Sequence, residues 1–72
     1  MSMNKAKELW DEYQSDATWE PYDTIDAYDT ECNITLDVDG FRYEGTGTIS
    51  CGEKVVSELF CTTPDGVEIK LV

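Results

Sequence analysis

Asp39-Gly40 is the feature that most constrains the fold of this chain, because it stands between two stretches of alternating apolar and polar side chains. An Asp-Gly pair in this setting predicts a β-hairpin, since both central residues of a type I′ turn need a positive φ. A two-residue turn also fixes the register of the two strands. The predicted opposite pairs are Val38 with Phe41, Leu36 with Tyr43, Ile34 with Gly45, and Cys32 with Gly47.

This register gives the hairpin one apolar face and one polar face. The polar face carries Asp37 and Arg42 as a cross-strand pair of opposite charge. We expect this face to meet water. Its other members are Asn33, Thr35, Glu44, Thr46 and Thr48.

Residues 3 to about 16 are predicted to form a helix that packs on the apolar face of the hairpin. Apolar side chains recur there at three- and four-residue steps, and Ser2 is a suitable N-cap. Gly45 and Gly47 would leave room for a close approach of the helix or for the Trp10 ring. The apolar stripe of this helix consists of Met3, Ala6, Leu9, Trp10, Tyr13 and Ala17.

The remaining segments extend the predicted sheet. Residues 17–31 lack periodicity and contain Pro21, so we interpret them as an acidic loop with a short helical turn near 22–27. Strands are predicted at about 54–62 and 67–72, joined by a turn in which Gly66 forms a G1 bulge. Val55 and Val56 cannot both follow the alternation, which indicates a further bulge or an irregular start of the strand. Thr63, Cys61 and Leu59 are expected to face inward together with Val67, Ile69 and Leu71.

The sequence therefore predicts an α+β fold, in which an N-terminal helix packs on a four-stranded antiparallel β-meander over residues 32–72. With 72 residues, the chain is expected to be a single domain spanning 1–72. The predicted core contains Trp10, Ile34, Leu36, Val38, Phe41, Ile69 and Leu71.

The three cysteines indicate a reducing, cytoplasmic setting, because they are odd in number and no signal peptide or long apolar segment accompanies them. Cys32 and Cys61 are expected to be inward-facing free thiols, and Cys51 lies at a predicted turn. No metal site is expected, since the chain has no His and the cysteines lack zinc-type spacing. A calcium loop starting at Asp29 fails because Ile34 and Gly40 stand where Gly and Glu are needed.

No catalytic function is expected from this sequence. It has no His, and no Gly-rich loop opens a helix, so the usual acid/base and nucleotide-binding arrangements are missing. Paired carboxylates could serve glycoside hydrolysis, but a chain of this length offers little depth for a cleft. No cofactor is implied.

The formal net charge of −11 is the main functional signal, because it exceeds what solubility requires. It disfavours nucleic acids and anionic membranes as direct partners and favours a basic protein surface. Eleven carboxylates lie between Lys7 and Arg42 without one basic residue. In the predicted helix, Glu8, Glu12 and Asp16 repel one another at i, i+4, and they oppose the helix dipole.

A row of surface carboxylates can imitate the phosphates of DNA and occupy the basic groove of a nucleic-acid-binding protein. In size, charge and order of elements, the chain resembles the small acidic inhibitors encoded by phages and mobile elements, such as anti-CRISPR proteins, anti-restriction proteins and uracil-DNA glycosylase inhibitors. No residue motif carries this resemblance, so no functional residue is transferred. The candidate contact residues are Glu8, Asp11, Glu12, Asp16, Glu20, Asp23, Asp26 and Asp29.

Two other functions fit the same charge. The chain could be an acidic binding module, such as an immunity protein or antitoxin, for a specific basic protein without DNA mimicry. It could also be a halophilic domain whose acidic residues form a solvated surface. Oligomeric state and the identity of the target do not follow from the sequence.

Overall fold

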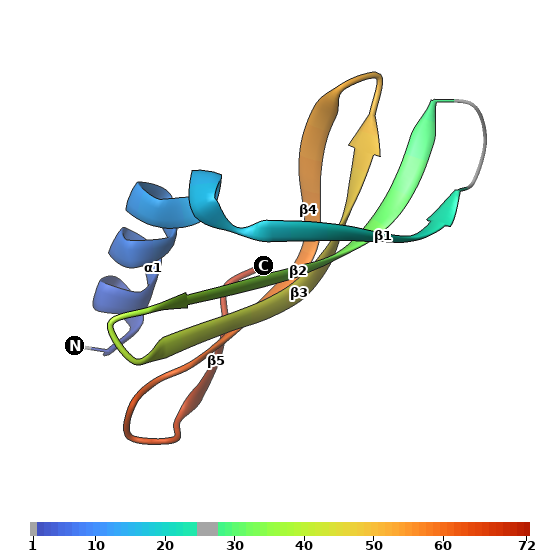
Figure 1. Ribbon diagram of the computed structural model, residues 1–72. Coiled ribbons are helices and arrows are strands. Elements are labelled where there is room, and N and C mark those ends of the chain that lie inside the picture. The colour runs from blue at the N-terminus through green and yellow to red at the C-terminus, as the bar shows by residue number, and fades with distance from the viewer. Residues whose placement is uncertain (1, 25–27) are drawn as a thin grey trace.

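The computed structural model describes residues 2–24 and 28–72 and consists of a helix packed against one antiparallel sheet (Figure 1). The helix α1 spans Ser2–Tyr13 and continues into the 3₁₀ turn η1, Gln14–Asp16. The sheet has the order β1-β2-β3-β4-β5. The strands are β1 (Thr18–Thr24), β2 (Asp29–Val38), β3 (Phe41–Ser50), β4 (Glu53–Thr62) and β5 (Glu68–Lys70). The α+β prediction is confirmed.

The prediction of four strands is wrong, because part of the expected acidic loop at 17–31 forms β1 and the start of β2. Thr18, Trp19 and Tyr22 are residue types that favour strands. Pro21 is tolerated because β1 is an edge strand. The helical turn expected near 22–27 is absent from residues 22–24, and residues 25–27 lie outside the described part of the chain.

The predicted hairpin is confirmed as β2 and β3, with every expected opposite pair in place. Asp39 and Gly40 have φ of 51° and 82°, as a type I′ turn requires. Arg42 Nε donates a hydrogen bond to Asp37 Oδ1 at 3.1 Å on the polar face. The turn type and the alternation together therefore determine this part of the fold.

The core lies between α1 and the apolar face of the sheet. Tyr43 is fully buried there; its ring contacts that of Trp10 at a centroid distance of 5.5 Å, and its hydroxyl donates a hydrogen bond to the Ala6 carbonyl. Of the predicted core residues, Val38, Phe41 and Leu71 are only partly buried, at the margin of the cluster. The buried cluster is Ala6, Leu9, Trp10, Ile34, Leu36, Tyr43, Leu59, Cys61 and Ile69.

Gly45 and Gly47 allow close approaches that differ from the predicted ones. A Cβ on Gly47 would lie 2.6 Å from Cζ3 of Trp19, so the ring that uses this space is Trp19, whereas Trp10 was expected there. A Cβ on Gly45 would lie 2.1 Å from the Glu58 carbonyl oxygen, so this glycine admits the backbone of β4 rather than the helix. Replacing either glycine with a residue that has a Cβ would force neighbouring atoms to shift.

The last connection follows the predicted geometry except at Val67. Gly66 has a φ of 88°, and its N–H donates to the Thr63 carbonyl at 2.9 Å. Thr63 is buried and its hydroxyl accepts a hydrogen bond from the Val67 N–H at 3.1 Å. Val67, which we expected to face inward, is 51% exposed; it lies in the connection just before β5.

Candidate functional site

Two β-bulges determine which charged side chains reach each face of the sheet. The extra residue is Tyr22 in β1 and Ser57 in β4. One extra residue moves all following side chains to the other face, because side chains alternate with a period of two. The bulges thus direct Asp23 and Glu53 away from the helix, and the bulge in β4 turns Lys54 to the helix-bearing side.

The result is a cluster of carboxylates on the face of the sheet opposite α1. Asp23 pairs with Glu31 across β1 and β2, and Glu58 pairs with Thr46 across β3 and β4. None of these carboxylates is buried; Asp29 and Glu31 are partly exposed and the others are exposed. We call this surface the acidic face; it comprises Glu20, Asp23, Asp29, Glu31, Glu53 and Glu58.

Basic side chains are excluded from the acidic face. Lys5 and Lys7 belong to α1. Arg42 lies on the same side of the sheet but at the end near the β2–β3 turn, where it forms an ion pair with Asp37. Lys70, opposite Phe60, is also on this side of the sheet, but it lies in the edge strand β5 and not on the rung of Glu58. In the described parts of β1 to β4, no Lys or Arg falls on the rungs that carry the six carboxylates.

Neutral donors hold two of these carboxylates in place. Glu31 accepts hydrogen bonds from the Thr48 hydroxyl at 2.6 Å and from the Tyr22 hydroxyl at 3.3 Å. Asp29 accepts a hydrogen bond from the Ser50 hydroxyl at 2.5 Å. Desolvation, followed by the neighbouring Glu31, raises the pKa of Tyr22, so its hydroxyl remains a donor. These bonds orient the carboxylates and leave their negative charge in place.

The acidic face is arranged against the stability of the sheet. Asp23 and Glu31 are direct cross-strand partners of like charge, an arrangement that destabilises a strand pair. A residue of opposite charge at position 23 would favour the fold, because it would face the Glu31 carboxylate. Folding alone therefore does not explain this pair, just as it does not explain the acids of the helix.

The predicted contact residues do not form one surface. Glu20, Asp23 and Asp29 belong to the acidic face, whereas the four helical acids, Glu8, Asp11, Glu12 and Asp16, are exposed on the other layer of the molecule. Asp26 lies outside the described residues. The helix and the segment after it were expected to act together, but that segment is a strand whose acids point away from the helix.

Glu31, Glu53 and Glu58 were missed as candidate residues. Glu31 and Glu58 lie at polar positions of alternating strands, so the alternation could have placed them on this face. Glu53 could be placed only with the position of the bulge at Ser57, which the sequence indicated near Val55 and Val56 but did not locate.

The described residues offer little for other chemistry. They contain no group of three His, Cys, Asp or Glu side chains that could hold a metal ion. Cys32 and Cys61 are buried, as predicted, and Cys51 is exposed at the turn between β3 and β4. Burial raises the pKa of the Cys61 thiol, which makes it a poor nucleophile.

Comparisons of the chain with models of protein families, with curated proteins and with solved structures find no match. In the described ranges, 2–24 and 28–72, no helix has the length and apolar character needed to cross a membrane. The functional argument therefore depends on the geometry of the chain itself.

Proposed function

We propose that this protein is a non-catalytic inhibitor that mimics DNA and blocks the basic nucleic-acid-binding groove of a DNA-processing or host defence protein. The acidic face is its principal contact surface. The observation that supports this most is a group of six solvent-accessible carboxylates on one sheet face with no basic side chain among them. An anti-CRISPR, anti-restriction or glycosylase-inhibitor role in the cytoplasm of a host cell fits this surface.

The spacing of a sheet suits the mimicry of phosphates. Side chains on one face recur about every 6.5 to 7 Å along a strand, and neighbouring strands lie about 4.8 Å apart. Each strand of DNA presents one phosphate about every 3.4 Å along the helix axis. Carboxylates on successive rungs, such as Glu20 and Asp23, therefore recur at about twice the axial rise between phosphates.

The charge of the face also suits a competitor of DNA. A surface of one sign attracts a basic groove over long range and accelerates association at low salt. Glu31 and Asp29 are already oriented by hydroxyl donors, so binding requires less ordering of these side chains. The like-charge pair Asp23 and Glu31 loses part of its repulsion when a cation binds between the two carboxylates.

The test compares two variants with the same change in charge. The acidic-face variant combines Glu20→Gln, Asp23→Asn, Glu53→Gln and Glu58→Gln. The helix variant combines Glu8→Gln, Asp11→Asn, Glu12→Gln and Asp16→Asn. All eight side chains are exposed, so we expect both variants to fold.

The wild-type protein is used to capture its partner from a bacterial lysate, and the Kd of the purified partner is then measured for all three proteins. We expect the acidic-face variant to lose at least about tenfold in affinity, which is about 0.35 kcal/mol for each of four charges. The helix variant should lose much less, and double-stranded DNA should compete with the wild-type protein. Equal losses in the two variants, or no competition by DNA, would overturn the proposal.

The second candidate is an acidic binding module, of the immunity-protein or antitoxin kind, for a basic protein without DNA mimicry. A groove with two tryptophans on the helix side of the sheet favours it, because such a groove offers specific contacts that DNA does not make. A partner that DNA fails to displace, and that binds the acidic-face variant normally, would identify this function.

A further inference from the structure

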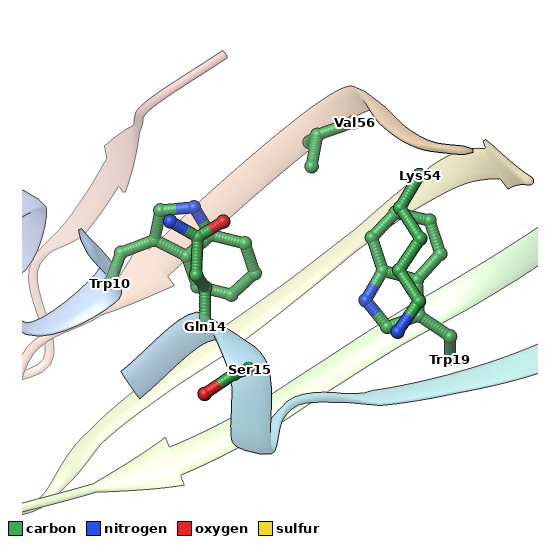
Figure 2. Close-up of a pocket in the computed structure, with 6 residues that line it drawn as sticks. All are labelled: Trp10, Gln14, Ser15, Trp19, Lys54 and Val56. Carbon is green, nitrogen blue, oxygen red and sulfur yellow. The ribbon is translucent and has the colours of Figure 1, made fainter. Parts of the chain in front are cut away.

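A groove lies between η1 and the sheet. It has a volume of about 370 Å³ and is open to solvent along one side. Trp10 and Trp19 stand at its two ends, and polar groups come from Gln14 and Ser15 (Figure 2). The remaining lining residues are Lys54 and Val56. This volume is at the small end for ligand sites and suits a single side chain.

The Trp19 ring forms a fixed platform in this groove. It lies against Gly47 of β3, at a place where even a Cβ would approach within 2.6 Å of the ring. A glycine inside a strand weakens the strand, and its presence here is explained by two close approaches, that of the Trp19 ring and that of the Val55 carbonyl oxygen, which would also lie 2.6 Å from a Cβ. The Cζ3–Cη2 edge of the indole is held in this way against the sheet, and the side chain lines the groove.

Lys54 makes a cation–π contact with the Trp19 ring. Its ammonium lies over the ring, with Nζ 5.5 Å from the ring centroid, and the two side chains are stacked in Figure 2. Lys54 is exposed, so its position in the groove is accessible to an exchanging cation. Among the residues that line the groove, Lys54 is the one basic group.

We infer that this groove receives an arginine side chain of the basic partner, whose guanidinium replaces the Lys54 ammonium on Trp19. The inference rests on the proposed function in one respect, because it presumes a basic partner. The groove lies on the helix side of the sheet, so its contact is separate from those of the acidic face on the opposite side. Lys54 would occupy the site when the protein is alone and leave it when the partner binds.

Arginine fits this groove better than lysine does. Its guanidinium is planar, stacks on indole rings and is less strongly hydrated than an ammonium. The amide oxygen of Gln14 and the hydroxyl of Ser15 can accept hydrogen bonds from its five donors. The net charge of −11 attracts a cation to the groove and disfavours an anion.

The probe for this site is N-acetyl-arginine amide, titrated into the ¹⁵N-labelled protein while the two indole N–H signals of Trp10 and Trp19 are followed by NMR. N-acetyl-citrulline amide, which is neutral and nearly isosteric, is the control ligand. We expect saturable shifts of both indole signals with the arginine probe and none with citrulline. Equal responses to the two probes would overturn the inference.

Lys54→Ala and Lys70→Ala form a matched pair, because each removes one exposed lysine and only Lys54 lies in the groove. We expect Lys54→Ala to bind the arginine probe about two- to fivefold more tightly, since no internal cation competes for Trp19. Lys70→Ala should match the wild type. Equal affinities of the two variants would also overturn the inference.

This experiment is independent of the test of the proposed function, because it uses no partner protein. If the arginine probe fails while the acidic-face variant loses its partner, the groove inference falls and the DNA-mimic proposal stands. If the arginine probe binds as expected while the acidic-face variant keeps full affinity for the partner, the groove inference stands and the DNA-mimic proposal falls.

Discussion

At the scale of single residues, Tyr43 connects the two layers through one hydroxyl. The side chain is fully buried and its hydroxyl donates to the Ala6 carbonyl of α1. Tyr43→Phe should lower the free energy of unfolding by about 1 kcal/mol, the usual net value of one such bond. Urea denaturation measures the loss. Tyr22→Phe removes an exposed tyrosine hydroxyl and should cost much less; equal losses would contradict this role of Tyr43.

Tyr43 also makes the free energy of unfolding depend on pH in the alkaline range. Burial raises the pKa of this phenol above the 10.0 of a free tyrosine side chain. The folded chain therefore keeps this proton when the unfolded chain begins to lose it, and the stabilisation is complete below about pH 10 and lost as the pH rises further. The free energy of unfolding, measured by denaturation from pH 8 to 11, should fall less steeply in Tyr43→Phe. Identical slopes would show that Tyr43 ionises as freely in the folded state.

At the scale of elements, the alternation of strands can be tested by two neighbouring substitutions in β2. Leu36 is buried against α1, whereas Thr35 is exposed on the opposite face. Leu36→Ala should cost about 2 to 5 kcal/mol, because it removes packed methyl groups from the core. Thr35→Ala should stay within about 1 kcal/mol, the span of strand propensities. Comparable denaturation midpoints for the two variants would contradict the register of the hairpin.

The elements differ in how far the sequence predicts them, and the bulges explain the difference. Asp39-Gly40 and an uninterrupted alternation were sufficient to predict β2 from Cys32 onward and its register with β3, whereas residues 29–31 were assigned to the loop. β1 was missed because the extra residue Tyr22 interrupts its alternation and Pro21 resembles a loop signal. Val55 and Val56 indicated a bulge or an irregular start of β4 without a defined position. The side of the sheet that Lys54 and Glu53 take could therefore not be derived.

At the scale of the whole molecule, the acids that are contiguous in the sequence are divided by the fold. The helical acids are exposed on the helical layer, which covers one side of the sheet, and the acidic face lies on the other side. The two tryptophans and Lys54 gather on the helix side. Sequence reasoning recognised the excess of charge, but the division into two surfaces depends on tertiary packing and on two single-residue bulges.

The molecule is small enough for most of its charges to interact with one another at low salt. Its longest dimension is 41 Å and the other two are 19 and 16 Å. The Debye length is about 30 Å at 0.01 M salt and about 3 Å at 1 M, so most of its charges repel one another at low salt and few do at high salt. The melting temperature should therefore rise by several degrees between these salt concentrations, and it should rise less in the acidic-face variant.

Salt should act on partner binding in the opposite direction, because screening weakens the attraction to a basic groove while it relieves the repulsion inside the free protein. We expect the melting temperature to rise and the affinity for the partner to fall over the same salt series, with the acidic-face variant showing smaller changes in both. Thermal unfolding and titration of the same samples measure the two quantities. A halophilic domain would instead be unfolded at 0.01 M salt and would show no loss of binding at higher salt. A protein that is folded at low salt and loses its partner as salt increases therefore carries its acidic residues for recognition.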